Sequence, residues 1–142
     1  MRVRVSQAAV LDQFGLVAAI EEHATRLDGA ALRVTVEAPT SVPPLPAAVE
    51  VATYLIAREA LSNVVNHSGA RSAVVRLAIR AGPPRSALLL EVNDEGAGIP
   101  EGHRCGVGLK SMRERAEELG GSLSISSSCA GTSVSARLPL GV

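Results

Sequence analysis

The feature that most constrains this chain is a run of glycines between a strand-like segment and a helical one. The apolar run Ala87 to Val92 has the pattern of a buried strand, and Leu109 to Leu119 has the spacing of an amphipathic helix. Glycine lets the backbone approach a ligand closely, and a helix that begins there points free N–H groups at that ligand. The pattern therefore predicts a phosphate-binding connection. Its glycines are at positions 96, 98, 102, 106 and 108.

The spacing of these glycines excludes two common phosphate motifs. No Gly-Lys-Ser/Thr follows them, as a Walker A loop requires. The pairs Gly96/Gly98 and Gly106/Gly108 are separated by a loop, whereas the dinucleotide-binding fingerprint opens a helix directly. Asp94 stands at the end of the apolar strand, where its carboxylate could accept a hydrogen bond from the amino group of a base. A flexible surface loop is the alternative that the glycines alone leave open.

Composition narrows the class of protein. The chain has 142 residues, is 46% hydrophobic and 20% charged, and carries a formal net charge of zero. These values indicate one globular domain and argue against a general nucleic-acid binder. Aromatic platforms for bases are not expected, because Phe14 and Tyr54 are the only Phe, Tyr or Trp residues. Cys105 and Cys129 lack the spacing of a metal site or a disulfide framework, which favours a reducing compartment.

Apolar periodicity predicts eight elements, in the order helix, strand, helix, strand, strand, helix, strand, strand. This order indicates an α+β fold, a two-layer α/β sandwich whose mixed, largely antiparallel sheet is covered on one face by helices. Pro46 is expected in the first turn of the second helix, Gly120 and Gly121 at the C-cap of the third, and Arg76 and Arg80 at a solvated sheet edge. The elements are expected at Leu16–Leu27, Leu32–Glu37, Ala47–His67, Ser72–Arg80, Ala87–Val92, Leu109–Leu119, Ser122–Ser127 and Gly131–Leu138, the last two as a hairpin.

The longest helix, Ala47–His67, carries two stripes. Its core side is expected to hold Val51, Leu55, Leu61 and Val65. A second stripe is polar, and its carboxylate and amide oxygens are hard ligands that suit Mg²⁺. The alternative interpretation of this stripe is a solvated helix face without a metal. The polar stripe consists of Glu59, Asn63, Asn66 and His67, at spacings of three and four residues.

Four boxes follow one another in the chain: Arg58-Glu-Ala-Leu-Ser-Asn63, Asp94-Glu-Gly-Ala-Gly98, Gly106-Val-Gly-Leu109 and Gly131-Thr132. Taken in order, they resemble the ATP-binding domain shared by histidine kinases, the Hsp90 and gyrase ATPases and mismatch-repair ATPases. The run from Gly106 to Gly121 resembles the NarL-type subfamily of bacterial sensor histidine kinases, and the resemblance extends from about Leu16 to Pro139. It implies a Bergerat-type fold and a catalytic domain that transfers the γ-phosphoryl group of ATP to a histidine on a separate dimerisation domain.

The resemblance implies roles for the matching residues. Glu59 and Asn63 would be catalytic, and Asn63 would also coordinate the metal, with ATP and Mg²⁺ as the cofactors. Asp94 would accept a hydrogen bond from the adenine amino group, and Thr132 would help to hold the base. The glycines would let the backbone pass the nucleotide and border its phosphates. The full set implied to bind ATP is Asn63, Asn66, His67, Asp94, Gly96, Gly98, Ile99, Gly106, Val107, Gly108, Leu109 and Thr132.

The chain departs from the family pattern at three places. Asn66 stands where a basic residue is frequent, and Glu95 stands where Asn or Asp is more usual. The loop over residues 100–105 is short for an ATP lid and carries no aromatic motif. The Asn66 departure leaves open a nucleotide-binding regulatory module without transfer activity. The length of 142 residues also suits a stand-alone anti-sigma-factor-type serine kinase of the same fold.

An acceptor histidine of the NarL type is not visible. The acceptor in that subfamily is followed directly by an acidic residue, whereas His23, His67 and His103 are not. Residues 1–28 are interpreted as a partly helical remnant of the connection from an upstream dimerisation and phosphoacceptor hairpin, and residues 29–142 as the ATP-binding domain.

The implied partners follow from this interpretation. They are the phosphoacceptor domain of the same kinase and, indirectly, a response regulator. No contact with nucleic acid or membrane is expected of this segment. No apolar stretch is long enough to span a membrane and no secretory signal is visible. We expect an isolated domain that is monomeric and cytoplasmic, whether free or as the cytoplasmic part of a membrane-bound sensor.

Overall fold

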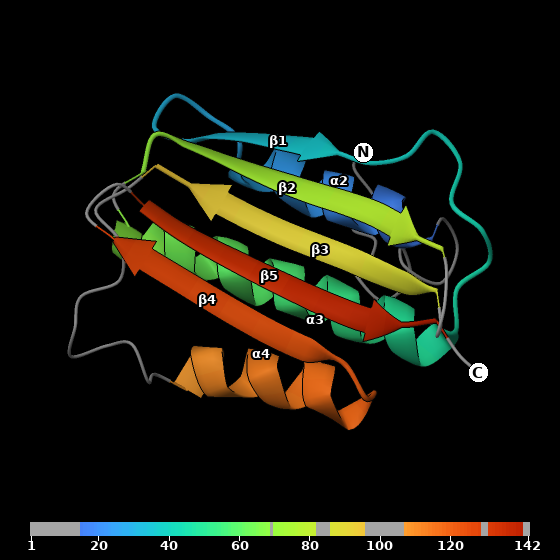
Figure 1. Ribbon diagram of the computed structural model, residues 1–142. Helices are drawn as coiled ribbons and strands as arrows, with labels where there is room; N and C mark the ends of the chain where they lie inside the picture. The colour runs from blue at the N-terminus through green and yellow to red at the C-terminus, as the bar shows by residue number, and fades with distance from the viewer. Residues whose placement is uncertain (1–14, 69, 82–85, 96–106, 129–130, 141–142) are drawn as a thin grey trace, which may run out of the picture.

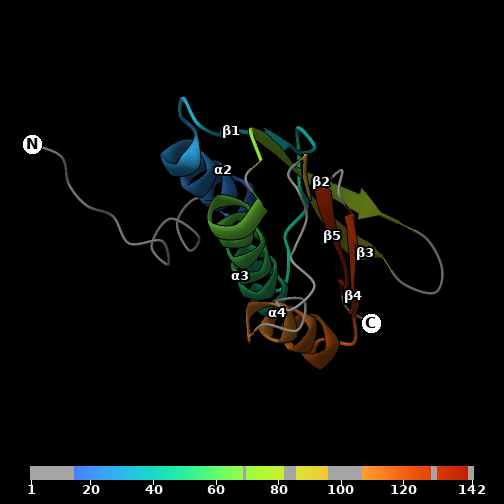
Figure 2. The ribbon, with the colours of Figure 1, turned by 90° about the vertical axis from the view of Figure 1, so that its left-hand side faces the viewer.

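The computed structural model describes residues 15–68, 70–81, 86–95, 107–128 and 131–140. Their elements follow the expected order, and the α+β expectation is confirmed by a single sheet with helices packed on one of its faces (Figures 1 and 2). The helices are α2 (Leu16–Leu27), α3 (Ala47–Asn63), the π-helix η1 (Val64–Ser68) and α4 (Val107–Glu118). The strands are β1 (Arg33–Glu37), β2 (Ser72–Arg80), β3 (Ala87–Asp94), β4 (Ser122–Ser128) and β5 (Gly131–Pro139).

The five strands lie in the order β1-β2-β3-β5-β4. β1 runs parallel to β2, and the other three neighbouring pairs are antiparallel, which includes the expected hairpin of β4 and β5. Asp94, the last residue of β3, lies opposite Ala73 near the start of β2, and Asn93 lies opposite Ser133 near the start of β5. The end of β3 therefore lies between the beginnings of two neighbouring strands.

The core lies between the sheet and the helices, and it is almost entirely aliphatic. Side chains of a strand alternate between the two faces of a sheet, so every second residue of β2, β3 and β5 is buried. Val75, Leu90 and Leu138 are fully buried from the sheet side, and Ile56 and Leu61 from α3. Each such side chain stabilises the fold by about 1.5–3 kcal/mol relative to an exposed one. Met112 and Ala116 extend this core beneath α4.

The prediction for the core side of α3 is wrong for two residues. Val51 and Val65 are 46% and 50% exposed, whereas Leu61 is buried as expected. Three alanines of α3 are buried, and α3 contacts α2 and α4 as well as the sheet. Because α3 carries apolar residues on most of its circumference, their spacing alone does not select the buried side. The buried residues of α3 are Val49, Ala52, Thr53, Tyr54, Ile56, Ala57, Ala60 and Leu61.

The ends of two helices show how local sequence sets their limits. Pro46 lies one position earlier than predicted, as the N-cap of α3 with φ −57° and ψ 140°. At the end of α4, Gly120 has φ +79° and the N–H of Gly121 donates to the carbonyl of Ala116 at 2.9 Å. This is the glycine C-cap expected from the sequence.

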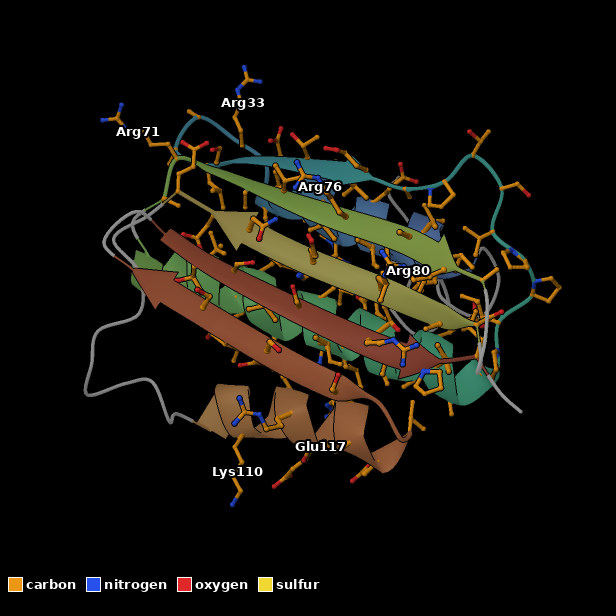
Figure 3. The ribbon with its side chains drawn as sticks, viewed as in Figure 1. Arg33, Arg71, Arg76, Arg80, Lys110 and Glu117 are labelled. Atoms are coloured by element: carbon orange, nitrogen blue, oxygen red, sulfur yellow. The ribbon has the colours of Figure 1, made fainter. Side chains whose placement is uncertain are left out.

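The face of the sheet opposite the helices is open and carries arginines. The prediction of a sheet edge is wrong for Arg76, which pairs with Glu37 of β1 on one side and Glu91 of β3 on the other. Arg80 lies beyond the end of the β1 pairing, so only β3 flanks it. Both side chains stand on the open face (Figure 3). Arg76 Nε lies 3.2 Å from Glu37 Oε1 of β1, and both side chains are half-exposed. Within the described part of the chain, no helix has the length and apolar character needed to cross a membrane.

Candidate nucleotide-binding site

A small pocket lies between α3 and the strand ends of β3 and β5. Three of its residues, Asn63, Asp94 and Thr132, are polar, and each was expected from the sequence to contact ATP. They come from three elements that are far apart in the chain, so the fold brings together what the sequence separates. The other lining residues are Ala60, Val64, Val92 and Val134.

The strands place two of the polar residues by simple alternation. Val92 is buried toward the helices, so Asp94, two residues later, points to the same side at the end of β3. Thr132 and Val134 are related in the same way at the start of β5, and Thr132 is only 8% exposed. A carboxylate and a hydroxyl therefore face the pocket from two neighbouring strands above an apolar floor.

Gly131 lets these two strand ends approach each other. Its φ is +138°, a conformation that residues with a side chain rarely adopt. A Cβ atom at this position would collide with the carbonyl oxygen of Asp94. The sequence placed Gly131 in a family box without a role, and the structure shows that β5 needs glycine there to pass the backbone of Asp94.

The helix supplies the opposite wall. Asn63 and Val64 follow Ala60 by three and four residues, which puts all three on one side of the helix. Glu59 is partly buried on the same helix and does not line the pocket. The apolar wall residues were not identified from the sequence, although their spacing of two residues from Asp94 and Thr132, and of one and three from Asn63, would have found them.

Beyond Asn63 the helix changes to the wider π-form, which is rare and often marks functional sites. Asn66 lies in this segment, is exposed, and its Nδ2 donates to the Ser62 hydroxyl at 3.2 Å. The backbone of His67 belongs to the same turn. The expected continuous α-helix to His67 is therefore wrong for its last turn.

The remaining expected residues fall at the start of α4 or outside the description. Val107, Gly108 and Leu109 form the first turn of α4, whose free N–H groups suit an anion. Gly96, Gly98, Ile99 and Gly106 lie outside the described residues.

The pocket is narrow. Its cavity volume is about 10 Å³, enough for about one water molecule. These residues therefore form a corner that could receive one polar edge of a base. Among the described residues, no three His, Cys, Asp or Glu side chains gather as a metal site. A metal here would depend on an amide such as that of Asn63 and on ligands from the nucleotide.

His23 lies in a different environment, at the contact between α2 and α3. Its ring meets that of Tyr54 edge-on with centroids 6.4 Å apart, and the Arg58 guanidinium carbon lies 5.9 Å from the Tyr54 ring centre. Burial, reinforced by the positive charges of Arg26 and Arg58 and partly offset by Glu22, lowers the pKa of His23 below its usual 6.5. The position is that of a packing residue between two helices.

Comparison with known proteins places this geometry in a family. Residues 48–142, about two thirds of the chain, match the family described as histidine kinase-, DNA gyrase B-, and HSP90-like ATPase. The chain is 37% identical over 138 residues to the sensor histidine kinase MctS of Rhizobium johnstonii, covering 92% of this chain and 29% of that protein. It is 35% identical over 142 residues to the sensor histidine kinase NarS of Mycobacterium tuberculosis, covering 93% and 31%.

The fold agrees with a solved structure of the same kind. The histidine kinase domain of the blue-light activated histidine kinase EL346 from Erythrobacter litoralis has a TM-score of 0.71 and 25% identity to this chain. The match covers 89% of this chain and 64% of that one. This chain spans about three tenths of the length of the two curated relatives.

Proposed function

The chain belongs to the histidine kinase, DNA gyrase B and HSP90-like ATPase family, and we propose that its pocket binds ATP for transfer of the γ-phosphoryl group to a histidine of a separate helical hairpin domain. As an ATPase domain of the histidine kinase type, it has the fold on which this transfer is carried out. The observation that carries the proposal is the convergence of Asn63, Asp94 and Thr132 in one pocket.

Asp94 is proposed to read adenine. Its side chain faces the pocket beside Thr132, and a carboxylate accepts hydrogen bonds that the 6-amino group of adenine donates. Thr132 is nearly buried, and its hydroxyl can both donate and accept. This pair suits an amino-purine edge, which presents a donor beside an acceptor.

The phosphates are proposed to lie toward the end of α3 and the start of α4. Asn63 faces the pocket from α3, and its amide oxygen is the kind of ligand that Mg²⁺ accepts when phosphates and waters supply the rest. The metal would neutralise charge on the phosphates. Asn66 and His67 in η1, and the first turn of α4, are proposed to border the same groups, together with Gly96, Gly98, Ile99 and Gly106.

In the proposed transfer, an imidazole nitrogen of the hairpin histidine forms a bond to the γ-phosphorus. The bond from that phosphorus to the β–γ bridging oxygen breaks, ADP leaves with the electron pair, and the imidazole proton passes to a base. Glu59, one turn before Asn63 on α3, is proposed to polarise the acceptor. Most of the acceleration would come from positioning and charge stabilisation.

The proposed context is a larger kinase. Residues 1–28 would connect to an upstream hairpin, residues 29–142 would bind ATP, and a response regulator would receive the phosphoryl group afterwards. We propose a cytoplasmic location, a monomeric isolated domain, and no contact of this segment with nucleic acid or membrane. The relatives are named as sensor histidine kinases and are more than three times as long as this match, which supports a partner domain in the same protein.

Phosphotransfer to an added domain tests the function. The purified chain with Mg²⁺ and radiolabelled ATP should acquire no acid-labile, base-stable label, because none of its three histidines precedes an acidic residue. Addition of the kinase's hairpin domain should place label on that domain, weakly, because the tether that raises effective concentration is missing. Stoichiometric phosphohistidine on this chain alone, located by mass spectrometry, would contradict the proposal. Acid-stable phosphoserine on a partner protein would favour the anti-sigma-type serine kinase.

A further inference from the structure

A hydrogen bond on the open face of the sheet joins the two strands that carry the base-reading residues. The hydroxyl of Ser133 donates to Oδ1 of Asn93 at 2.5 Å, and the pair is partly buried. The two residues lie directly opposite each other in the antiparallel register of β3 and β5. An O–H···O contact of this length is at the short end of the usual range for such bonds.

The residues next to this pair face the pocket. Asp94 follows Asn93 on β3, and Thr132 precedes Ser133 on β5, so their side chains point to the opposite side of the sheet. Both line the pocket. The hydrogen bond is therefore one residue behind the two polar groups that would contact adenine, and it links the backbones that carry them.

The hydrogen bond lies near the ends of both strands, where it can affect the spacing between them. β3 ends at Asp94 and β5 begins at Gly131, so few ladder bonds lie beyond Asn93 and Ser133. The backbone contact between Gly131 and Asp94 brings the strand ends close. At the end of an antiparallel pair, a cross-strand side-chain bond restricts relative movement of the two strands that the central ladder does not control.

We propose that Asn93 and Ser133 are positioning residues for base recognition, an inference that rests on the proposed function. Their hydrogen bond holds Asp94 and Thr132 at the spacing that matches an amino-purine edge. Its loss lets the two pocket residues move apart, which weakens the contact with the 6-amino group more than contacts elsewhere on the nucleotide. The pair thereby sets the preference of the site for adenine over a 6-oxo-purine.

Calorimetric titration with ATP and with inosine triphosphate measures this preference directly. In inosine triphosphate a carbonyl oxygen replaces the 6-amino group, so the donor to Asp94 is lost while sugar and phosphates are unchanged. The preference is the dissociation constant for inosine triphosphate divided by that for ATP. This ratio should fall about three- to tenfold in Ser133→Ala, the range expected for loss of one hydrogen bond. Ser133→Thr keeps the hydroxyl and should retain the ratio.

A matched control separates positioning from general strand stability. Ser135 lies two residues along the same face of β5, opposite Glu91 and further from the pocket. Ser135→Ala should leave the ratio unchanged, even if it lowers the urea midpoint as much as Ser133→Ala does. Asn93→Ala should reduce the ratio as Ser133→Ala does, and the double variant should add little further, because both changes break one interaction.

Two results would overturn the inference in distinguishable ways. A wild-type chain that binds ATP and inosine triphosphate equally, or neither of them, would refute the proposed function and this inference with it. A wild-type preference that Asp94→Asn abolishes but Ser133→Ala leaves intact would refute the positioning role alone and leave the proposed function standing.

Discussion

At the scale of single residues, the pocket depends on side chains whose direction is set by strand alternation and helical spacing. Asp94 and Thr132 face it because Val92 and Val134, two residues away, are buried on the same side. Asn63 faces it as part of a helical trio with Ala60 and Val64. The proposed adenine and metal contacts therefore lie on different elements, so substitutions can separate them.

Asp94→Ala and Asp94→Asn should weaken ATP and ADP alike. The carboxylate would contact the base, which both nucleotides share, and loss of one partner of a buried polar contact costs about 1–3 kcal/mol. Calorimetry measures the two affinities, and circular dichroism checks the fold. The control is Glu91→Gln, which changes a carboxylate on the same strand. Unchanged ADP affinity in a folded Asp94 variant would remove this residue from base recognition.

Asn63→Ala should affect metal-dependent binding selectively. If its amide oxygen ligates Mg²⁺, the gain in ATP affinity on adding Mg²⁺ should shrink, while adenosine and metal-free ADP still bind. Titrations with and without Mg²⁺ measure the difference, and Val51→Ala, at an exposed position of the same helix, serves as the control. An equal loss for all ligands would indicate disruption of α3 instead of a metal contact.

At the scale of elements, the contact between α2 and α3 contains a titratable group. His23 has a lowered pKa in the folded chain, because burial and the nearby Arg26 and Arg58 disfavour its charged form. Between the ordinary histidine pKa of about 6.5 and the lower folded value, the unfolded chain binds more protons. The free energy of unfolding therefore rises with pH across this window, and the contribution of neutral His23 is lost as the pH falls below about 6.5.

His23→Gln should flatten this dependence. Glutamine keeps a polar side chain of similar length without a proton to gain, so the variant should lose less stability than the wild type as the pH falls from 7 to 5. Urea unfolding at a series of pH values gives both curves. Thr25→Ala, on the exposed side of α2, should shift the whole curve without changing its slope. Parallel wild-type and His23→Gln curves would contradict the pKa assignment.

At the scale of the whole molecule, α2 is part of the core. Leu16, Ala19, Ile20 and Ala24 are buried against its neighbours, and α2 contacts both α3 and β1. The sequence interpretation placed the ATP-binding domain at residues 29–142, with α2 in the connecting segment. Helix α2 can belong both to the connecting segment and to the core if the connecting segment docks on the ATP-binding domain through this helix.

Truncation tests the docking. A chain of residues 15–142 keeps α2 and should unfold cooperatively in urea. A chain of residues 29–142 should unfold at a clearly lower midpoint, because burial of Leu16 and Ile20 alone contributes about 1.5–3 kcal/mol each. Equal midpoints for the two chains would show that α2 does not contribute to stability and that residues 29–142 form the stable domain.

The sequence by itself determined the elements whose signals are local. The strands β2 and β5 carry a two-residue alternation, the glycines after α4 specify its end, and the first and last residues of α2 were placed correctly. The prediction that Asn63, Asp94 and Thr132 contact ATP came from boxes that resemble a known family, and the three residues line one pocket.

The tertiary structure alone decided what depends on contacts between distant segments. Helix α3 is apolar on most sides, so its buried side was settled by its packing against α2, α4 and the sheet, and Val51 and Val65 are exposed. The inner position of β2 put Arg76 between two strands instead of at a sheet edge, since strand order is not encoded in one strand's pattern. The hydrogen bond between Ser133 and Asn93 joins residues 40 positions apart, and only the register of β3 against β5 creates it.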